Sequence, residues 1–257
     1  MTETVTSADG TTIAFERIGH GPALILVDAA SCFREFGPMR SLSQALKDEF
    51  MVYIYDRRGR GESTDTPPYN VDKEVDDLRS LIEAAGGAAF VHGFSSGAVL
   101  GLHAAARGLS VKKLTLLEPP VELDPDPSEP DLGEEVNDLI AHGRRGEAIE
   151  HFNRSIGVPD EMIAGLRSAP FWPALEDLAH TLAYDATITG TFTRNHLSAV
   201  TMPALVINSE ATDDRLKAWG EEVASGLPNG SHRALPGEWH GVAPEALAPV
   251  MTGFFKS

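Results

Sequence analysis

The chain has 257 residues, of which 42% are hydrophobic and 23% are charged, as expected of a globular protein large enough to bury a core of its own. Its formal net charge of −17 disfavours nucleic acid and anionic membrane surfaces as partners, because both repel an acidic protein. The single Cys32 excludes an internal disulfide, no Cys/His cluster has zinc-ligand spacing, and no apolar run approaches the ~20 residues of a membrane-spanning helix.

Strand and helix patterns alternate along the first half of the chain, which is typical of a largely parallel sheet flanked by helices. A hairpin is expected first, because two strand-like runs flank the turn dipeptide Asp9-Gly10. The expected strands are 4–6, 11–17, 23–27, 51–55, 88–91 and 113–117, and the expected helices are 41–49, 71–85 and 96–107.

The pattern changes after the strand at 113–117. Residues 123–130 are acidic and rich in proline, as in a linker, and residues 133–197 are helical in pattern without a convincing strand. The alternation then resumes with strands at 204–208 and 232–235 and helices at 215–226 and 244–255. We therefore expect an α/β fold with an eight-stranded, mostly parallel sheet and helices on both faces. The expected domains are a core of residues 1–122 and 198–257 and a helical lid, 123–197, inserted in it.

The motif Gly93-Phe94-Ser95-Ser96-Gly97 lies where a strand pattern stops and a helix pattern starts. A sharp strand-to-helix turn of this kind lifts a serine hydroxyl above the sheet, and it needs small residues on both sides of the serine. We interpret Ser95 as a nucleophile.

A serine hydroxyl needs a neighbouring base that removes its proton. Among nine histidines, His240 lies in the loop between the last strand and the last helix, on the edge of the sheet where the serine turn opens. His92, three residues before Ser95, is the main alternative, but its position inside the strand favours packing beneath the turn.

The segments 56–63 (DRRGRGES), 93–97 (GFSSG) and 237–240 (GEWH) together resemble the α/β-hydrolase family across nearly the whole chain. The resemblance implies the α/β-hydrolase fold and the chain order nucleophile, acid, histidine. It also makes a structural role more plausible than anion binding for the three arginines of 56–63.

The acid of this family usually follows the strand at 204–208, but Thr212 stands where the spacing expects Asp. Asp213 is one alternative. Glu118 is the favoured one, since a carboxylate directly after an apolar strand is costly to bury without a partner. Haloalkane dehalogenases and a fungal lactonase of the family place their acid after the corresponding strand.

The family's oxyanion loop carries a His-Gly dipeptide that is absent here, where residues 27–32 read VDAASC. Backbone N–H groups can still bind an oxyanion, and the expected donors are those of Ala30 and Ser96. The nearby carboxylate of Asp28 is unusual, and its orientation is left open.

These residues predict a serine hydrolase that cleaves an ester, thioester or lactone of a hydrophobic small molecule, with no metal and no cofactor. The expected lid carries aromatic and long apolar side chains that either line an apolar pocket or pack the lid: Phe152, Met162, Phe171, Trp172 and Tyr184. Cofactor-free haloperoxidase or perhydrolase chemistry and a non-catalytic ligand-binding protein are the alternatives. The first 20 residues lack a signal-peptide pattern, so a cytoplasmic location is expected. No oligomeric state is predicted.

Overall fold

A computed structural model of the chain describes residues 1–126, 128 and 130–257, and it contains one eight-stranded sheet. The strand order is β1-β2-β4-β3-β5-β6-β7-β8, in which β1, β2 and β4 pair antiparallel and every pair from β4 to β8 is parallel. The strands are β1 (Glu3–Thr6), β2 (Thr12–Gly19), β3 (Ala23–Val27), β4 (Met51–Tyr55), β5 (Ala89–Phe94), β6 (Val111–Leu117), β7 (Ala204–Ser209) and β8 (Gly230–Leu235). The predicted sheet is therefore confirmed.

The central strands are short apolar runs that helices cover on both faces. The five residues of β3, ALILV, are all buried except the first, and the six of β7 are all buried. The edge strand β1 alternates between half-buried and exposed residues. This is the difference expected between interior parallel strands and an edge strand that faces water on one side.

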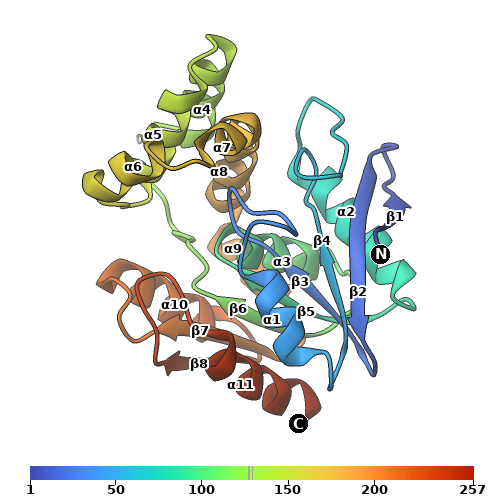
Figure 1. The fold of residues 1–257 in the computed structure, drawn as a ribbon. Helices are drawn as coiled ribbons and strands as arrows, with labels where there is room; N and C mark the ends of the chain where they lie inside the picture. Colours follow the sequence, from blue (N-terminus) through green and yellow to red (C-terminus); the bar gives the residue numbers. More distant parts are fainter. Residues whose placement is uncertain (127, 129) are drawn as a thin grey trace.

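Helices α2 (Val71–Ala84), α3 (Ser96–Ala106) and α10 (Asp214–Gly226) pack on one face of the sheet. Helices α1 (Met39–Leu46) and α11 (Pro244–Lys256) pack on the other face, where they lie beside each other (Figure 1). Helices α1, α2, α10 and α11 turn an apolar stripe inward, whereas α3 is buried along nearly its whole length. This arrangement leaves the carboxyl ends of the parallel strands free to carry loops.

A group of helices connects β6 to β7, which are neighbours in the sheet, and Figure 1 shows it gathered to one side of the sheet. Most of its apolar residues form a cluster of their own around Phe152, Leu175 and Leu182, whereas Ile188 and Leu197 pack into the core on the sheet. Its members are α4 (Leu132–Ala141), α5 (Arg145–Ser155), α6 (Asp160–Arg167), α7 (Trp172–Leu178), the 3₁₀ turn η1 (Ala179–Thr181), α8 (Leu182–Thr191) and α9 (Arg194–Leu197). The division into a core and a lid with the boundaries given above stays a prediction.

The first helix differs from its predicted range of 41–49, because α1 begins at Met39, directly after Pro38, and ends at Leu46. Its carbonyl end closes in a turn, in which the N–H groups of Glu49 and Phe50 both donate to the Leu46 oxygen. This turn brings the fully buried Phe50 ring into the core. Burial of this aromatic side chain explains why the helix ends at Leu46 and does not continue to residue 49.

Candidate active site

Ser95 lies between the end of β5 and the first residue of α3, with φ 53° and ψ −125°. This is an unusual conformation for a residue with a side chain, and it persists only where the surroundings enforce it. A Cβ on Gly93 would come within 2.4 Å of the Gly97 oxygen, and one on Gly97 within 2.4 Å of the Val27 oxygen. The two glycines of the motif are therefore required sterically.

The structure brings Ser95, His240 and Glu118 together in one chain of hydrogen bonds. The Oγ of Ser95 is 2.9 Å from Nε2 of His240, and Nδ1 of His240 is 2.8 Å from Oε2 of Glu118. The three residues follow β5, β8 and β6, so the carboxyl edge of the sheet positions all of them. Each also has a positive φ, 53°, 54° and 46° respectively, so all three backbones hold unfavourable conformations at this one place.

The hydrogen-bond roles follow from the chemistry of the partners. An ionised carboxylate can only accept, so Nδ1 of His240 carries the proton toward Glu118. Nε2 is then the acceptor for the Ser95 hydroxyl. This tautomer is the one that a general base needs.

Glu118 is fully buried, and two further groups hold its carboxylate. The backbone N–H of Ser209 donates to Oε1 at 2.8 Å, and the hydroxyl of Thr212 donates to Oε2 at 3.1 Å. Thr212, which stands where the sequence spacing expects the acid, thus donates a hydrogen bond to Glu118. The sequence offered no signal for this role beyond the missing aspartate.

Asp213, the alternative acid, lies in a different environment. Its carboxylate caps α10 by accepting from the N–H of Leu216 at 2.8 Å, and it also accepts from Nε1 of Trp239 at 3.3 Å. The structure does not bring it to His240.

His92, the alternative base, is fully buried, and its Nδ1 lies 2.9 Å from the hydroxyl of Thr115. Burial lowers the pKa of His92 to about 3, so its ring stays neutral. The imidazole also lines a second cavity, and no hydrogen bond joins it to Ser95.

Ala30 and Ser96, the expected oxyanion donors, line the same cavity as Ser95. Within the described part of the chain, neither of their N–H groups donates to a protein acceptor. Arg57 donates to the backbone oxygen of Asp28 at 3.3 Å, and Arg60 donates to the backbone oxygen of Ala29 at 2.6 Å. Two guanidinium groups therefore fix the loop that carries Ala30.

These guanidinium groups are themselves held by Asp185 of α8, whose carboxylate is 2.7 Å from Arg57 and 2.6 Å from Arg60. The same carboxylate accepts from the Ser96 hydroxyl at 2.7 Å. All these side chains are buried. One acid from the helices between β6 and β7 therefore ties together both segments that carry the expected oxyanion donors.

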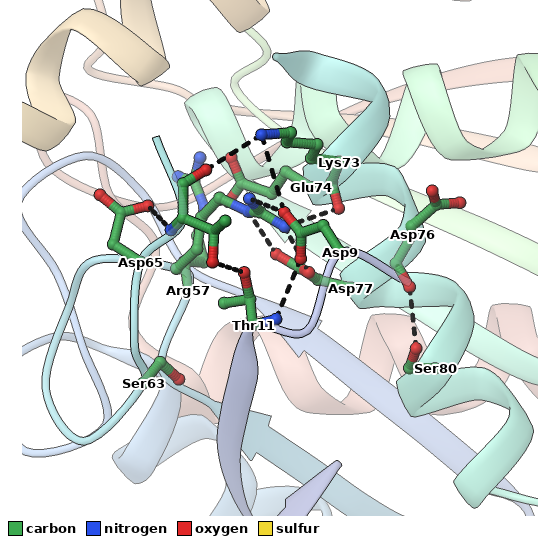
Figure 2. A network of polar contacts seen from close by, with 12 residues as sticks. Asp9, Thr11, Arg57, Ser63, Asp65, Lys73, Glu74, Asp76, Asp77 and Ser80 are labelled. Carbon is green, nitrogen blue, oxygen red and sulfur yellow. Dashed lines mark hydrogen bonds and ion pairs between the residues drawn. The ribbon is translucent and has the colours of Figure 1, made fainter. Parts of the chain in front are cut away.

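The arginines of the 56–63 segment therefore pair with carboxylates of the protein itself and hold its segments together. Arg57 also pairs with Glu74 at 2.6 Å, and Arg58 pairs with Asp77 at 2.7 Å, both on α2. Figure 2 shows Glu74 and Asp77 pointing into the same network of polar contacts as Asp9 and Arg57.

Asp28 is buried, and its Oδ1 accepts from the N–H of Ala29 at 2.9 Å. Burial raises the pKa of this carboxyl to about 7, against the opposing charges of Arg60 and Arg57. Asp28 is not among the residues that line the cavity around Ser95. A Cβ on Gly37 would meet its Oδ2 at 2.6 Å, so the carboxyl packs against the following loop.

The cavity that opens at Ser95 has a volume of about 160 Å³. Of the aromatic and apolar residues expected to line a pocket, only Phe152 lines this one, whereas Trp172 packs among the helices and Met162 and Phe171 are exposed. The remaining lining is Ala30, Ser95, Ser96, Pro120, Leu132, Ser155, Ile156, Asp185, Thr189, Arg215, Leu216, Trp219, Trp239 and His240. The wall is thus mostly apolar, and much of it comes from α10 and the loop before α11.

Among the described residues, no group of three or more His, Cys, Asp or Glu side chains could hold a metal ion. No helix in the described part of the chain has the length and hydropathy needed to cross a membrane.

Comparison with known proteins gives consistent results. The model of a family described as "Alpha/beta hydrolase family" matches residues 18–250. An alpha/beta hydrolase from Sphaerobacter thermophilus is 43% identical over 98% of this chain and 100% of its own, with a TM-score of 0.90. A thermophilic esterase from Thermogutta terrifontis is 23% identical (100% and 97% covered, TM-score 0.74), and an enol-lactonase from Burkholderia xenovorans is 18% identical (99% and 98% covered, TM-score 0.70).

Proposed function

Because this chain belongs to the α/β-hydrolase family and is a hydrolase, we propose that it cleaves a carboxylic ester, thioester or lactone through an acyl-enzyme on Ser95. The observation that carries this proposal is the continuous contact from Ser95 through His240 to Glu118, at 2.9 and 2.8 Å. A ligand-binding protein without catalysis would have no need for three strained residues that meet in this order.

In the proposed reaction His240 removes the proton of the Ser95 hydroxyl as the oxygen attacks the substrate carbonyl. The N–H groups of Ala30 and Ser96 stabilise the negative charge that develops on the carbonyl oxygen, a contribution of roughly 10²–10³-fold in rate per donor. His240 then gives its proton to the leaving group.

Water completes the cycle. His240 activates a water molecule that attacks the acyl-enzyme, and the proton returns to Ser95 when the acid product leaves. Glu118 stays ionised throughout and stabilises the imidazolium. Side chains and backbone amides carry every step, so the mechanism requires neither a metal nor a cofactor.

The substrate is proposed to be a small molecule with an apolar part. Support comes from the cavity at Ser95, whose volume of about 160 Å³ and apolar walls suit a short acyl chain or a compact ring. Haloperoxidase or perhydrolase chemistry uses the same residues and remains the alternative, but no contact in the structure favours it.

A fluorophosphonate probe and p-nitrophenyl esters of increasing chain length test the proposal. We expect the probe to label Ser95, as mapped by mass spectrometry, and the esters to be hydrolysed. Ser95→Ala should lose both activities, while Ser225→Ala, which removes an exposed hydroxyl on α10, should keep both. Absence of labelling and of ester turnover in the unmodified protein would refute the proposal.

A further inference from the structure

One cationic side chain lines the cavity at Ser95 and takes no part in the site described above. The cavity's carboxylate, Asp185, is already neutralised by two buried arginines, and His240 is engaged by Ser95 and Glu118. Arg215 remains, as the one guanidinium or ammonium group among the described residues of the lining.

Arg215 lies in the first turn of α10, on the wall of this cavity. Its guanidinium carbon is 5.0 Å from the centre of the Trp219 ring, and its Nη2 donates to the Ile156 oxygen at 2.7 Å. Trp219 and Ile156 both line the cavity, so the guanidinium is held at the cavity surface from two sides. A guanidinium has five N–H groups, and this hydrogen bond uses one of them.

The lack of an acidic partner distinguishes Arg215 from most arginines of the chain. Among the described residues, no carboxylate forms an ion pair with it, although Asp and Glu outnumber Lys and Arg by 38 to 21. Asp213 interacts with it only at longer range, because its carboxylate caps α10. The other polar side chains nearby are occupied, since the hydroxyls of Ser155 and Thr189 donate to carbonyl groups one turn earlier in their own helices. A guanidinium without an ion-pair partner on a mostly apolar wall can bind an anion.

We propose that Arg215 binds a free carboxylate on the substrate, so that the enzyme acts on esters, thioesters or lactones that carry a second, ionised carboxyl group. This inference rests on the proposed function. The planar fork of a guanidinium matches the two oxygens of a carboxylate, and the aromatic face of Trp219 keeps that fork oriented. The apolar wall would contact the carbon chain that joins the carboxylate to the reacting carbonyl.

The negative charge of the protein does not oppose this binding strongly. At physiological salt, exposed charges farther away than about 8 Å are largely screened, whereas direct contact with a guanidinium is not.

The test compares monoanionic esters with neutral isosteres. Monoethyl glutarate pairs with ethyl 5-methylhexanoate and carries its carboxylate on the acyl part, while O-butyryl glycolate pairs with isobutyl butyrate and carries it on the alcohol part. Acid release at constant pH gives kcat/KM for each. We expect at least one monoanion to exceed its isostere by about tenfold or more, the size expected of one charge-assisted contact.

Two variants assign the preference to Arg215. In Arg215→Gln the ratio of kcat/KM between the preferred monoanion and its isostere should fall about tenfold, mainly through KM. Arg233→Gln removes the same charge from an exposed position on β8 outside the cavity and should leave the ratio unchanged.

The possible failures are distinct. If neither kind of ester is cleaved, the proposed function fails and this inference fails with it. If the neutral esters are cleaved as well as the monoanions, or if Arg215→Gln lowers both by the same factor, the function stands and the role of Arg215 is refuted. The last result would mean that the arginine only tethers α10 to the end of α5.

Discussion

Replacement of Glu118 by glutamine tests the geometry of the site, because the two side chains have the same size but differ in what they can donate. In the native protein the backbone N–H of Ser209 donates to one carboxylate oxygen, and His240 and Thr212 donate to the other. A glutamine must turn its oxygen toward the backbone N–H of Ser209. In the opposite orientation its NH₂ group would lie about 2.8 Å from that N–H, and two donors would face each other. The NH₂ group then faces His240.

This orientation reverses the tautomer of the imidazole. Nδ1 of His240 becomes an acceptor for the glutamine NH₂, so Nε2 carries the proton and no longer accepts from Ser95. Loss of the base tautomer in a serine triad lowers kcat by ~10⁴-fold, equivalent to about 5 kcal/mol of transition-state stabilisation. We expect a loss of this order in Glu118→Gln, with little change in KM.

The assay is steady-state hydrolysis of a p-nitrophenyl ester, with Asp213→Asn as the matched control. Asparagine is as good a helix N-cap as aspartate, so the control keeps α10 and should retain activity within about tenfold. A loss of ~10²-fold or more in Asp213→Asn combined with nearly full activity in Glu118→Gln would show that Asp213 is the acid.

Three further predictions concern pH and stability. Burial raises the pKa of Asp28 from 3.8 to about 7, so between these values the folded protein holds a proton that the unfolded chain releases. The stability of the native protein therefore falls as pH rises through this window. Because asparagine does not titrate, the melting temperature of Asp28→Asn relative to the native protein should increase from pH 4 to pH 8 and then level off. Asp185→Ala strands two buried guanidinium groups and should cost about 3–5 kcal/mol, or about 10 °C in melting temperature, whereas Asp124→Asn on the surface should change it little. Gly97→Ala should prevent folding or abolish activity because its Cβ would overlap two backbone oxygens, whereas Gly253→Ala, which meets nothing within 4 Å, should stabilise α11 by about 0.5–1 kcal/mol.

Each of these has a clear contrary result. If the difference in melting temperature between Asp28→Asn and the native protein does not change with pH, the pKa of Asp28 lies near its ordinary value. Equal effects of Asp185→Ala and Asp124→Asn, measured by thermal unfolding, would mean that the buried ion pairs add nothing to stability. An active, stable Gly97→Ala would contradict the close packing at the serine turn.

Local sequence patterns were sufficient for the sheet and for the positions of the reactive groups. The strands at 23–27, 51–55 and 204–209 are recognisable because central parallel strands are continuous apolar runs between turns. Ser95 is recognisable because a strained turn tolerates only small residues nearby, and Gly93 and Gly97 are those residues. Glu118 could be favoured over Asp213 because a carboxylate at the end of a buried strand needs a partner.

Other features depend on contacts between distant parts of the chain. Asp185 meets Arg57 across 128 positions, and nothing in the helical pattern around it marks it as the residue that fixes the loop carrying Ala30. The role of Thr212 depends likewise on how the loop before α10 meets Glu118, and the place of Arg215 on the cavity wall depends on its contact with Ile156 at the end of α5.

The sequence by itself therefore determined the order of the elements, the strained serine turn and the candidate base and acid, because each rests on backbone geometry or burial within a few residues. Only the tertiary structure decided which carboxylate reaches His240, which side chains support it and which of the apolar residues at 123–197 line the cavity at Ser95. Those choices depend on side-chain directions where separate elements pack together, and no local pattern encodes them.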